Sequence, residues 1–178
     1  IFVTIDNYYN ETVSFLNTDR YVDSIGLSWD IPYDAEQFLV IRDGDTIAST
    51  INNVFIDRNI TPGIFYCYQI SCINHNAISG PLSITKCEKA LIAPPDNFTG
   101  SISQDTIRLS WSNVQEASQY RLYRDGNLIY TGQGLNFTDT NLSFATYYNY
   151  TVSCMDNIGV EGPQSNPLEL LTESELLA

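Results

Sequence analysis

Few side chains in this chain of 178 residues stand at spacings that would support catalysis. The single histidine, His75, lies between Asn74 and Asn76, with no nucleophile or carboxylate at a motif spacing from it. One histidine cannot by itself supply a zinc site or a histidine-based acid–base pair. The sequence also lacks the G-x-S-x-G, P-loop, dinucleotide-binding and H-E-x-x-H patterns. We therefore predict no enzyme activity, no cofactor, and no catalytic, cofactor-binding or metal-binding residue, and we expect His75 to be a solvated loop residue.

Two aspartates could suggest the pair of carboxylates that general acid–base chemistry uses. Asp57 and Asp139, however, lie 82 positions apart in matched surroundings. Each is expected to accept hydrogen bonds from the backbone of its own turn.

The tripeptides at 42–44 and 124–126 read Arg-Asp-Gly, which is not the order of an integrin-binding tripeptide. Their Asp-Gly is typical of a hairpin turn.

These residues lie on a framework that occurs twice in the chain. The offset of 82 positions superposes Leu27-Ser28-Trp29 on Leu109-Ser110-Trp111 and holds without an insertion from Leu27 to Ser83. A period of this length is too long for a solenoid repeat and suits an independent small domain. The sequence is therefore predicted to contain two copies of one domain.

Within each copy, apolar residues alternate with polar ones, which is the period of half-buried β-strands. Ile25, Leu27 and Trp29 follow this alternation, and so does the longer run from Tyr66 to Cys72. The Asp-Gly pairs between such runs predict type I′ hairpins. Strands at this spacing predict an all-β chain that folds as two antiparallel β-sandwiches.

The second copy, from Trp111 to Ser165, resembles a fibronectin type III module. It is most similar to modules found beside catalytic domains and in surface proteins of bacteria and archaea. The resemblance implies two tandem immunoglobulin-like β-sandwiches. It also implies a structural core that includes the tryptophan and the corner tyrosine of each copy: Trp29, Tyr66, Trp111 and Tyr148.

The two modules are expected over residues 10–90 and 91–173. Residues 1–9 are expected to be an N-terminal extension or the end of a preceding module, and residues 174–178 a tail. Pro94-Pro95 favours an extended entry into the second module.

Four cysteines allow three pairings if all are oxidised. Cys72 and Cys154 are equivalent in the two copies and lie on the inward register of their strands, so we expect buried free thiols. Cys67 and Cys87 occur only in the first copy, on the outward register of neighbouring antiparallel strands. A cross-strand disulfide between them is expected, and the alternative is two further reduced thiols.

The sequence contains six Asn-x-Ser/Thr signals, which would be glycosylated only on an exposed surface of a secreted eukaryotic protein. They start at Asn10, Asn59, Asn97, Asn136, Asn141 and Asn149. The alternative is that a chain rich in Asn, Ser and Thr produces such signals by composition.

The composition indicates a globular and strongly acidic chain, with 43% apolar residues, 8 basic and 21 acidic residues, and a net charge of −13. This charge disfavours nucleic acid and anionic membrane surfaces as partners, and no apolar window is long enough to span a bilayer. A row of exposed aromatic rings could stack on sugars, and five tyrosines are not evident core residues: Tyr8, Tyr9, Tyr33, Tyr130 and Tyr147.

The resemblance implies a non-catalytic spacer or protein-interaction segment of a larger secreted or cell-surface protein, located outside the cell, with the neighbouring domains of that polypeptide as partners. Two alternatives remain open. The chain could be a cell-adhesion or receptor ectodomain that binds a protein ligand. It could also be an accessory carbohydrate-binding module of a secreted glycoside hydrolase, with a glycan as ligand.

Overall fold

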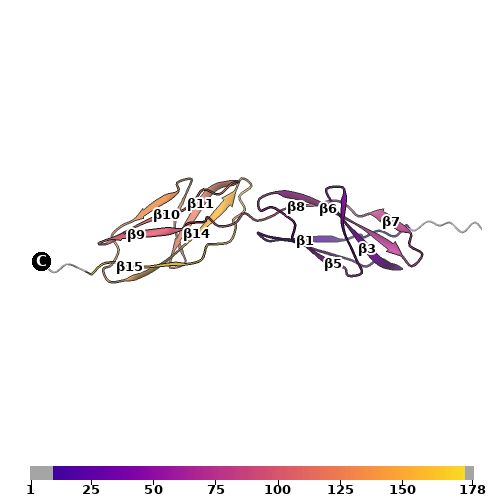
Figure 1. Ribbon diagram of the computed structural model, residues 1–178, viewed down its shortest axis with the longest axis horizontal. Coiled ribbons are helices and arrows are strands. Elements are labelled where there is room, and N and C mark those ends of the chain that lie inside the picture. Colours follow the sequence, from indigo (N-terminus) through magenta and orange to yellow (C-terminus); the bar gives the residue numbers. More distant parts are fainter. Residues whose placement is uncertain (1–9, 175–178) are drawn as a thin grey trace, which may run out of the picture. The chain divides into compact units, whose positions relative to one another are not determined.

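The computed structural model describes residues 10–174, so the expected N-terminal extension (1–9) and the end of the expected tail (175–178) lie outside the described residues. The chain divides into two compact units between Ala90 and Leu91. We call them unit 1 and unit 2. The regular structure of residues 10–174 consists of β-strands without a helix (Figure 1), which confirms the predicted all-β class. Consequently, no helix in this range could span a membrane.

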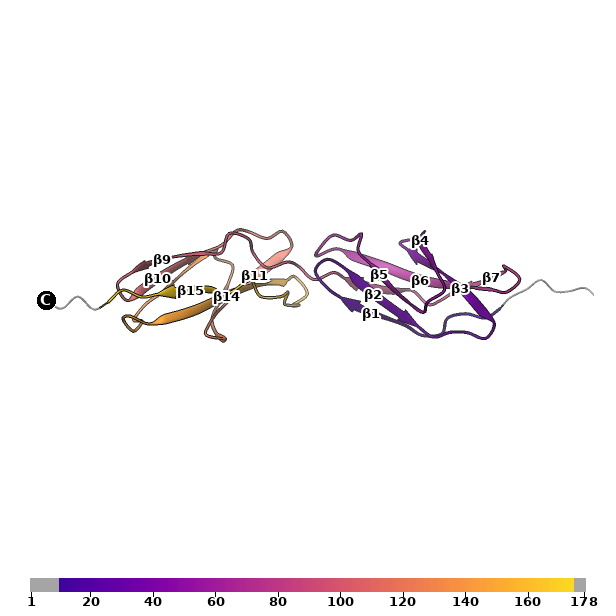
Figure 2. The same cartoon turned by 60° about the horizontal axis from the view of Figure 1, so that its bottom comes forward.

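Unit 1 contains two facing antiparallel sheets. Its strands are β1 (Leu16–Arg20), β2 (Ile25–Trp29), β3 (Ala35–Arg42), β4 (Asp45–Thr50), β5 (Val54–Asp57), β6 (Phe65–Asn74), β7 (Ser79–Leu82) and β8 (Lys86–Lys89). One sheet has the order β1-β2-β5, and the other has the order β4-β3-β6-β7, with β8 also paired to β6. Figure 2 shows the strands of the two layers.

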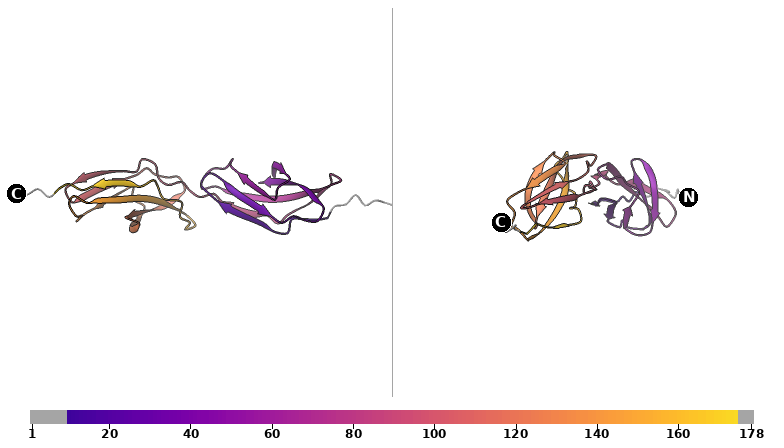
Figure 3. Two further views of the ribbon diagram at one scale, coloured as in Figure 1. Left: turned by 90° about the horizontal axis from the view of Figure 1, so that it is seen from below. Right: turned by 60° about the vertical axis from the view of Figure 1, so that its left-hand side comes forward.

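Unit 2 repeats this arrangement. Its strands are β9 (Thr99–Ser103), β10 (Thr106–Ser110), β11 (Ala117–Arg124), β12 (Asn127–Gly132), β13 (Asn136–Asp139), β14 (Tyr147–Asp156) and β15 (Leu168–Leu171). The sheets have the orders β13-β10-β9 and β12-β11-β14-β15. Figure 3 gives two further views of the strands, coloured along the sequence. Each unit is therefore a sandwich in which a three-stranded sheet faces the sheet that contains its longest strand.

The turns between strands have the chemistry that the sequence predicts. Asp43 and Gly44, which join β3 to β4, both have positive φ angles, and so do Asp125 and Gly126 between β11 and β12. A type I′ turn needs positive φ at both central residues, and Asp-Gly adopts this conformation readily. The backbone of Asp43 and Asp125 thus explains why the same dipeptide stands at both positions.

Each unit has its own hydrophobic core, built from the inward residues of both sheets. Trp29 packs edge-on against Phe38 in unit 1, with ring centroids 5.5 Å apart. Trp111 contacts a larger set of rings in unit 2, namely Phe98, Tyr120 and Tyr130. The two tryptophans are buried, each in the core of its own unit.

The corner tyrosines lie at the margin of the cores. Tyr66 and Tyr148 are half-buried and pack against the cores of their units. The hydroxyl of Tyr66 accepts a hydrogen bond from the backbone N–H of Thr61 at 2.8 Å, and that of Tyr148 accepts one from Ser143 at 3.0 Å. The fully buried tyrosines are those two positions further along the same strands, Tyr68 and Tyr150.

Candidate functional site

The most elaborate polar cluster in unit 1 joins its two sheets. Asp57, at the end of β5, accepts hydrogen bonds at Oδ2 from Arg42 Nη1 (2.8 Å) and from the hydroxyl of Tyr68 (3.0 Å). Its Oδ1 accepts a third from the backbone N–H of Asn59 at 3.0 Å. Arg42 ends β3 and Tyr68 lies in β6, so the carboxylate of one sheet is held by two side chains of the other.

Burial of this cluster changes the pKa values of its members. Asp57 is buried, and most of the Arg42 side chain is covered. Burial raises the pKa of Tyr68 far above its ordinary value, and the hydrogen bond to Asp57 and its negative charge raise it further. Burial alone would lower the pKa of Arg42, but its hydrogen bond to Asp57 and the charge of that carboxylate raise it instead. The arginine and the aspartate are thus held as an ion pair beside a neutral phenol.

Unit 2 contains the same cluster at the equivalent positions. Arg124 Nη1 donates to both oxygens of Asp139, at 3.0 and 2.9 Å, and the hydroxyl of Tyr150 donates to Asp139 Oδ2 at 2.8 Å. Burial and then the hydrogen bond to Asp139 raise the pKa of Tyr150, as for Tyr68. Because the cluster occurs in both units, we interpret it as a clamp between the sheets.

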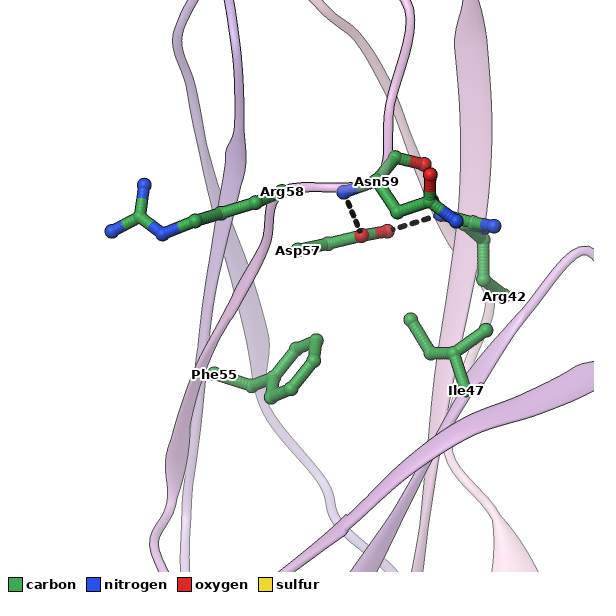
Figure 4. Close-up of a pocket in the computed structure, with 6 residues that line it drawn as sticks. All are labelled: Arg42, Ile47, Phe55, Asp57, Arg58 and Asn59. Carbon is green, nitrogen blue, oxygen red and sulfur yellow. Dashed lines mark hydrogen bonds and ion pairs between the residues drawn. The ribbon is translucent and has the colours of Figure 1, made fainter.

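A pocket of about 480 Å³ lies beside this clamp in unit 1 (Figure 4). Ile47 of β4 and Phe55 of β5 face each other across it, and the polar end contains the hydrogen-bonded side chain of Asp57 with Arg42 and Asn59. Arg58 also lines the pocket, but its guanidinium points away from the other side chains. The pocket therefore combines an apolar lining with a carboxylate that the protein already holds by three hydrogen bonds.

His75 has one close neighbour that its sequence surroundings did not indicate. Its Nδ1 lies 2.7 and 2.9 Å from the two carboxylate oxygens of Asp34, and both side chains are partly exposed. Asp34 comes from the loop before β3, which is why the spacing along the chain gave no signal. Within residues 10–174, no group of three or more His, Cys, Asp or Glu side chains is arranged to hold a metal ion.

The structure places the four cysteines in two distinct surroundings. Cys67 of β6 and Cys87 of β8 are direct cross-strand partners and form a disulfide. Cys72 and Cys154 are both buried and are not part of this disulfide. The thiol of Cys72 donates to the carbonyl oxygen of Glu11 at 3.1 Å, and that of Cys154 donates to the carbonyl oxygen of Ala93 at 3.4 Å. Each thiol is therefore hydrogen-bonded to the segment that precedes the first strand of its own unit.

Of the remaining predicted positions, those within residues 10–174 lie at the surface, with one exception. The six asparagines of the glycosylation signals (Asn10, Asn59, Asn97, Asn136, Asn141 and Asn149) are all exposed. Tyr33 and Tyr147 are also exposed, but they belong to different units, and Tyr8 and Tyr9 lie outside the described residues. The exception is Tyr130, which is half-buried and packs on Trp111 and Phe137 in the core of unit 2.

A second polar cluster occurs in unit 2 alone. Glu161 accepts hydrogen bonds from Arg121, Tyr123 and Ser153, at 2.5, 2.6 and 2.5 Å. Partial burial would raise the pKa of Glu161, but these three hydrogen bonds and the charge of Arg121 lower it overall. In unit 1 the positions of Arg121 and Tyr123 are occupied by Leu39 and Ile41, so no corresponding cluster can form.

The chain is similar in sequence to parts of several larger proteins. No family model matches the chain. It is 30% identical over 82 residues to a poly(3-hydroxybutyrate) depolymerase of Ralstonia pickettii, covering 46% of this chain and 17% of that protein. It is 31% identical over 144 residues to an amylopullulanase of Thermoanaerobacterium saccharolyticum (76% of this chain, 11% of that protein). It is also 39% identical over 127 residues to usherin of Rattus norvegicus (63% of this chain, 2% of that protein).

The chain is also similar to two solved structures. The central fibronectin-III array of RIM-binding protein is 16% identical, with a TM-score of 0.41, over 97% of this chain and 72% of that chain. The protein named FN3tt is 26% identical, with a TM-score of 0.40, over 47% of this chain and 97% of that chain.

The strand order of both units and the position of the tryptophan between the two sheets define the class of protein. Each unit is an antiparallel β-sandwich of the immunoglobulin-like type. The chain is a tandem pair of such sandwiches, and its sequence resembles that of fibronectin type III modules. It spans less than a fifth of the length of the depolymerase, the amylopullulanase and usherin.

Proposed function

We propose that this pair of modules is a non-catalytic segment of a larger extracellular protein, in which it spaces neighbouring domains or presents a surface for protein contact. The observation that carries the proposal is the repetition of the Arg–Asp–Tyr clamp. In both units this cluster holds a carboxylate by hydrogen bonds from an arginine and a tyrosine of the opposite sheet. Such a cluster serves the fold, which leaves the surfaces as the variable part of the molecule.

Two further observations support this role. The matched relatives include a depolymerase and an amylopullulanase, and the chain corresponds to only 17% and 11% of their lengths, as expected for an accessory segment. The Cys67–Cys87 disulfide supports an oxidising compartment such as the cell exterior. Both fit a secreted or surface-attached parent protein.

The test is to assay the purified segment for hydrolysis of starch, chitin and poly(3-hydroxybutyrate) films beside an active enzyme for each polymer. We expect no product above a buffer control. Product formation that is lost when Asp57 and Asp139 are both replaced by Asn in a folded variant would overturn the proposal. Glycan-array binding that depends on Tyr33 and Tyr147 would instead favour the carbohydrate-binding alternative.

A further inference from the structure

The two units share one framework. We therefore compared their equivalent surface positions, because a difference there points to a property that only one unit has. One such difference is found at an edge, between β5 of unit 1 and the equivalent β13 of unit 2. Each strand ends its three-stranded sheet, pairing only with β2 or β10 within residues 10–174. The outward row of β5 continues as Val54, Ile56 and Arg58, whereas that of β13 continues as Asn136, Thr138 and Thr140.

The outer row of β5 is strongly exposed. Val54 and Ile56 are 56% and 51% exposed, and Ile51 in the preceding turn is 76% exposed. Edge strands offer unpaired backbone N–H and C=O groups, and proteins usually protect them with charged or otherwise unfavourable residues. The edge of β13 has polar side chains at the corresponding positions, so the apolar row is specific to unit 1.

The pocket described above adjoins this edge. Phe55 points into it from β5, opposite Ile47 of the neighbouring edge strand β4 (Figure 4). A strand added alongside β5 would place its inward side chains beside Phe55 and its outward side chains beside Val54 and Ile56, because successive residues of a strand face opposite sides. The pocket could therefore receive one apolar side chain of such a strand.

Arg58 adds a charge to the same edge. Its side chain is exposed, and no carboxylate of residues 10–174 forms an ion pair with it. It is one of only 8 basic residues beside 21 acidic ones in the chain. An acidic side chain on a partner would complement it, whereas Thr140 gives unit 2 no such charge.

We propose that β5 of unit 1 binds an extended segment of another polypeptide as an added antiparallel strand. The segment carries an apolar side chain toward Ile47 and Phe55, β-branched side chains beside Val54 and Ile56, and a carboxylate opposite Arg58. This inference rests on the proposed role of the chain as a protein-contacting segment, and it names the contact surface and the chemistry of the partner.

The probe for the test is a seven-residue peptide, acetylated and amidated, with valine at its odd positions, glutamate at position 2 and threonine at positions 4 and 6. It is titrated to millimolar concentration into the ¹⁵N-labelled segment. We expect amide chemical-shift changes at β5 and at Ile47, with no change in unit 2. A peptide N-methylated at the amides that would face β5 should not bind, and exchanging its glutamate for lysine should weaken binding about two- to fivefold. Equal binding by the N-methylated peptide would overturn the proposal.

The decisive variant replaces Val54→Asn, Ile56→Thr and Arg58→Thr together, which gives unit 1 the residues that unit 2 has at these positions. Binding should be lost while the amide spectrum stays dispersed. The matched control replaces Leu82→Asn and Ile84→Asn, two exposed apolar residues of unit 1 outside β5, and should bind as the unmodified chain does. An equal loss of binding in the control would show general apolar adhesion and overturn strand addition.

Two further outcomes would also overturn the proposal. The first is shift changes at β5 that depend on protein concentration without peptide, because a second copy would then occupy the edge. The second is the absence of any change at β5. Neither result would affect the proposed non-catalytic role, which the hydrolysis assays test separately.

Discussion

At the residue scale, the molecule depends most on two buried carboxylates. Asp57 and Asp139 are both buried, and each satisfies an arginine and a tyrosine of the opposite sheet. Removing one member of a buried ion pair leaves the other charge without its partner, which costs more than the pair itself contributes. The aspartates therefore stabilise the sandwich even though the net value of each ion pair is modest.

We expect Asp57→Ala to destabilise unit 1 by about 3–5 kcal/mol, since Arg42 and the hydroxyl of Tyr68 lose their common acceptor. Urea denaturation followed by circular dichroism measures the change. The exposed Asp45→Ala serves as control and should change stability by less than about 0.5 kcal/mol. A loss for Asp57→Ala no larger than that of the control would contradict the clamp.

The raised pKa values of Tyr68 and Tyr150 predict how stability depends on pH. A group with a folded-state pKa above its ordinary value, here 10.0, contributes stability that is complete below that value and is lost as the pH rises above it. We therefore expect the segment to lose stability above about pH 10, with these two tyrosines ionising only on unfolding. Tyrosinate absorbance recorded with circular dichroism checks this. Complete ionisation of all tyrosines in the folded protein would exclude it.

The clamp also shows what sequence reasoning can and cannot reach. The offset of 82 positions matches Arg42, Asp57 and Tyr68 with their counterparts in unit 2, so the repeat itself contained the signal. Taken locally, however, Asp57 was expected to bind its own turn, and it does accept a hydrogen bond from Asn59. Its other two partners come from different strands of the opposite sheet, and only the three-dimensional pairing of those strands brings them together.

At the element scale, unit 1 and unit 2 differ in how the last strand is fixed to the long central one. In unit 1, Cys67 of β6 and Cys87 of β8 are covalently joined. In unit 2, the equivalent partners on β14 and β15 are Asn149 and Glu169, so only hydrogen bonds and packing hold these strands together. The disulfide should therefore stabilise unit 1 alone, and a reductant should remove this stabilisation.

We expect reduction of the disulfide to lower the stability of unit 1 by about 3 kcal/mol, because the unfolded chain regains the freedom of the loop between residues 67 and 87. Thermal unfolding with and without reductant measures this, and Cys67→Ser together with Cys87→Ser should reproduce it. If the oxidised and reduced forms unfold at the same temperature, the disulfide adds no stability and the expectation is wrong.

The elements themselves were the most predictable part of the molecule. Alternation in runs such as Ile25–Trp29 and the Asp-Gly turns indicates strands and hairpins because both signals are local. How deeply each inward side chain is buried was harder to predict from the sequence. Tyr66 and Tyr68 face the same side of β6, but Tyr66 lies at the rim of the sandwich and Tyr68 at its centre, which alternation does not distinguish.

At the scale of the whole molecule, the chain has two separate hydrophobic cores, each with one tryptophan. Trp29→Phe leaves Trp111 as the reporter of unit 2, and Trp111→Phe leaves Trp29 as the reporter of unit 1. We expect fluorescence-detected urea unfolding of these two variants to give different midpoints, with reductant shifting only the curve reported by Trp29. Coincident curves that both shift on reduction would show a single cooperative unit instead.

The two buried thiols could report mechanical opening of the units. Cys72 and Cys154 each lie behind the leading segment of their own sandwich, and burial raises the pKa of Cys154 to about 12. A tensile load on the polypeptide that detached a leading segment would uncover the thiol beneath it and make it reactive to a maleimide dye. The pair would then act as two internal tension sensors, and mass mapping of the labelled cysteine would tell which module had begun to open.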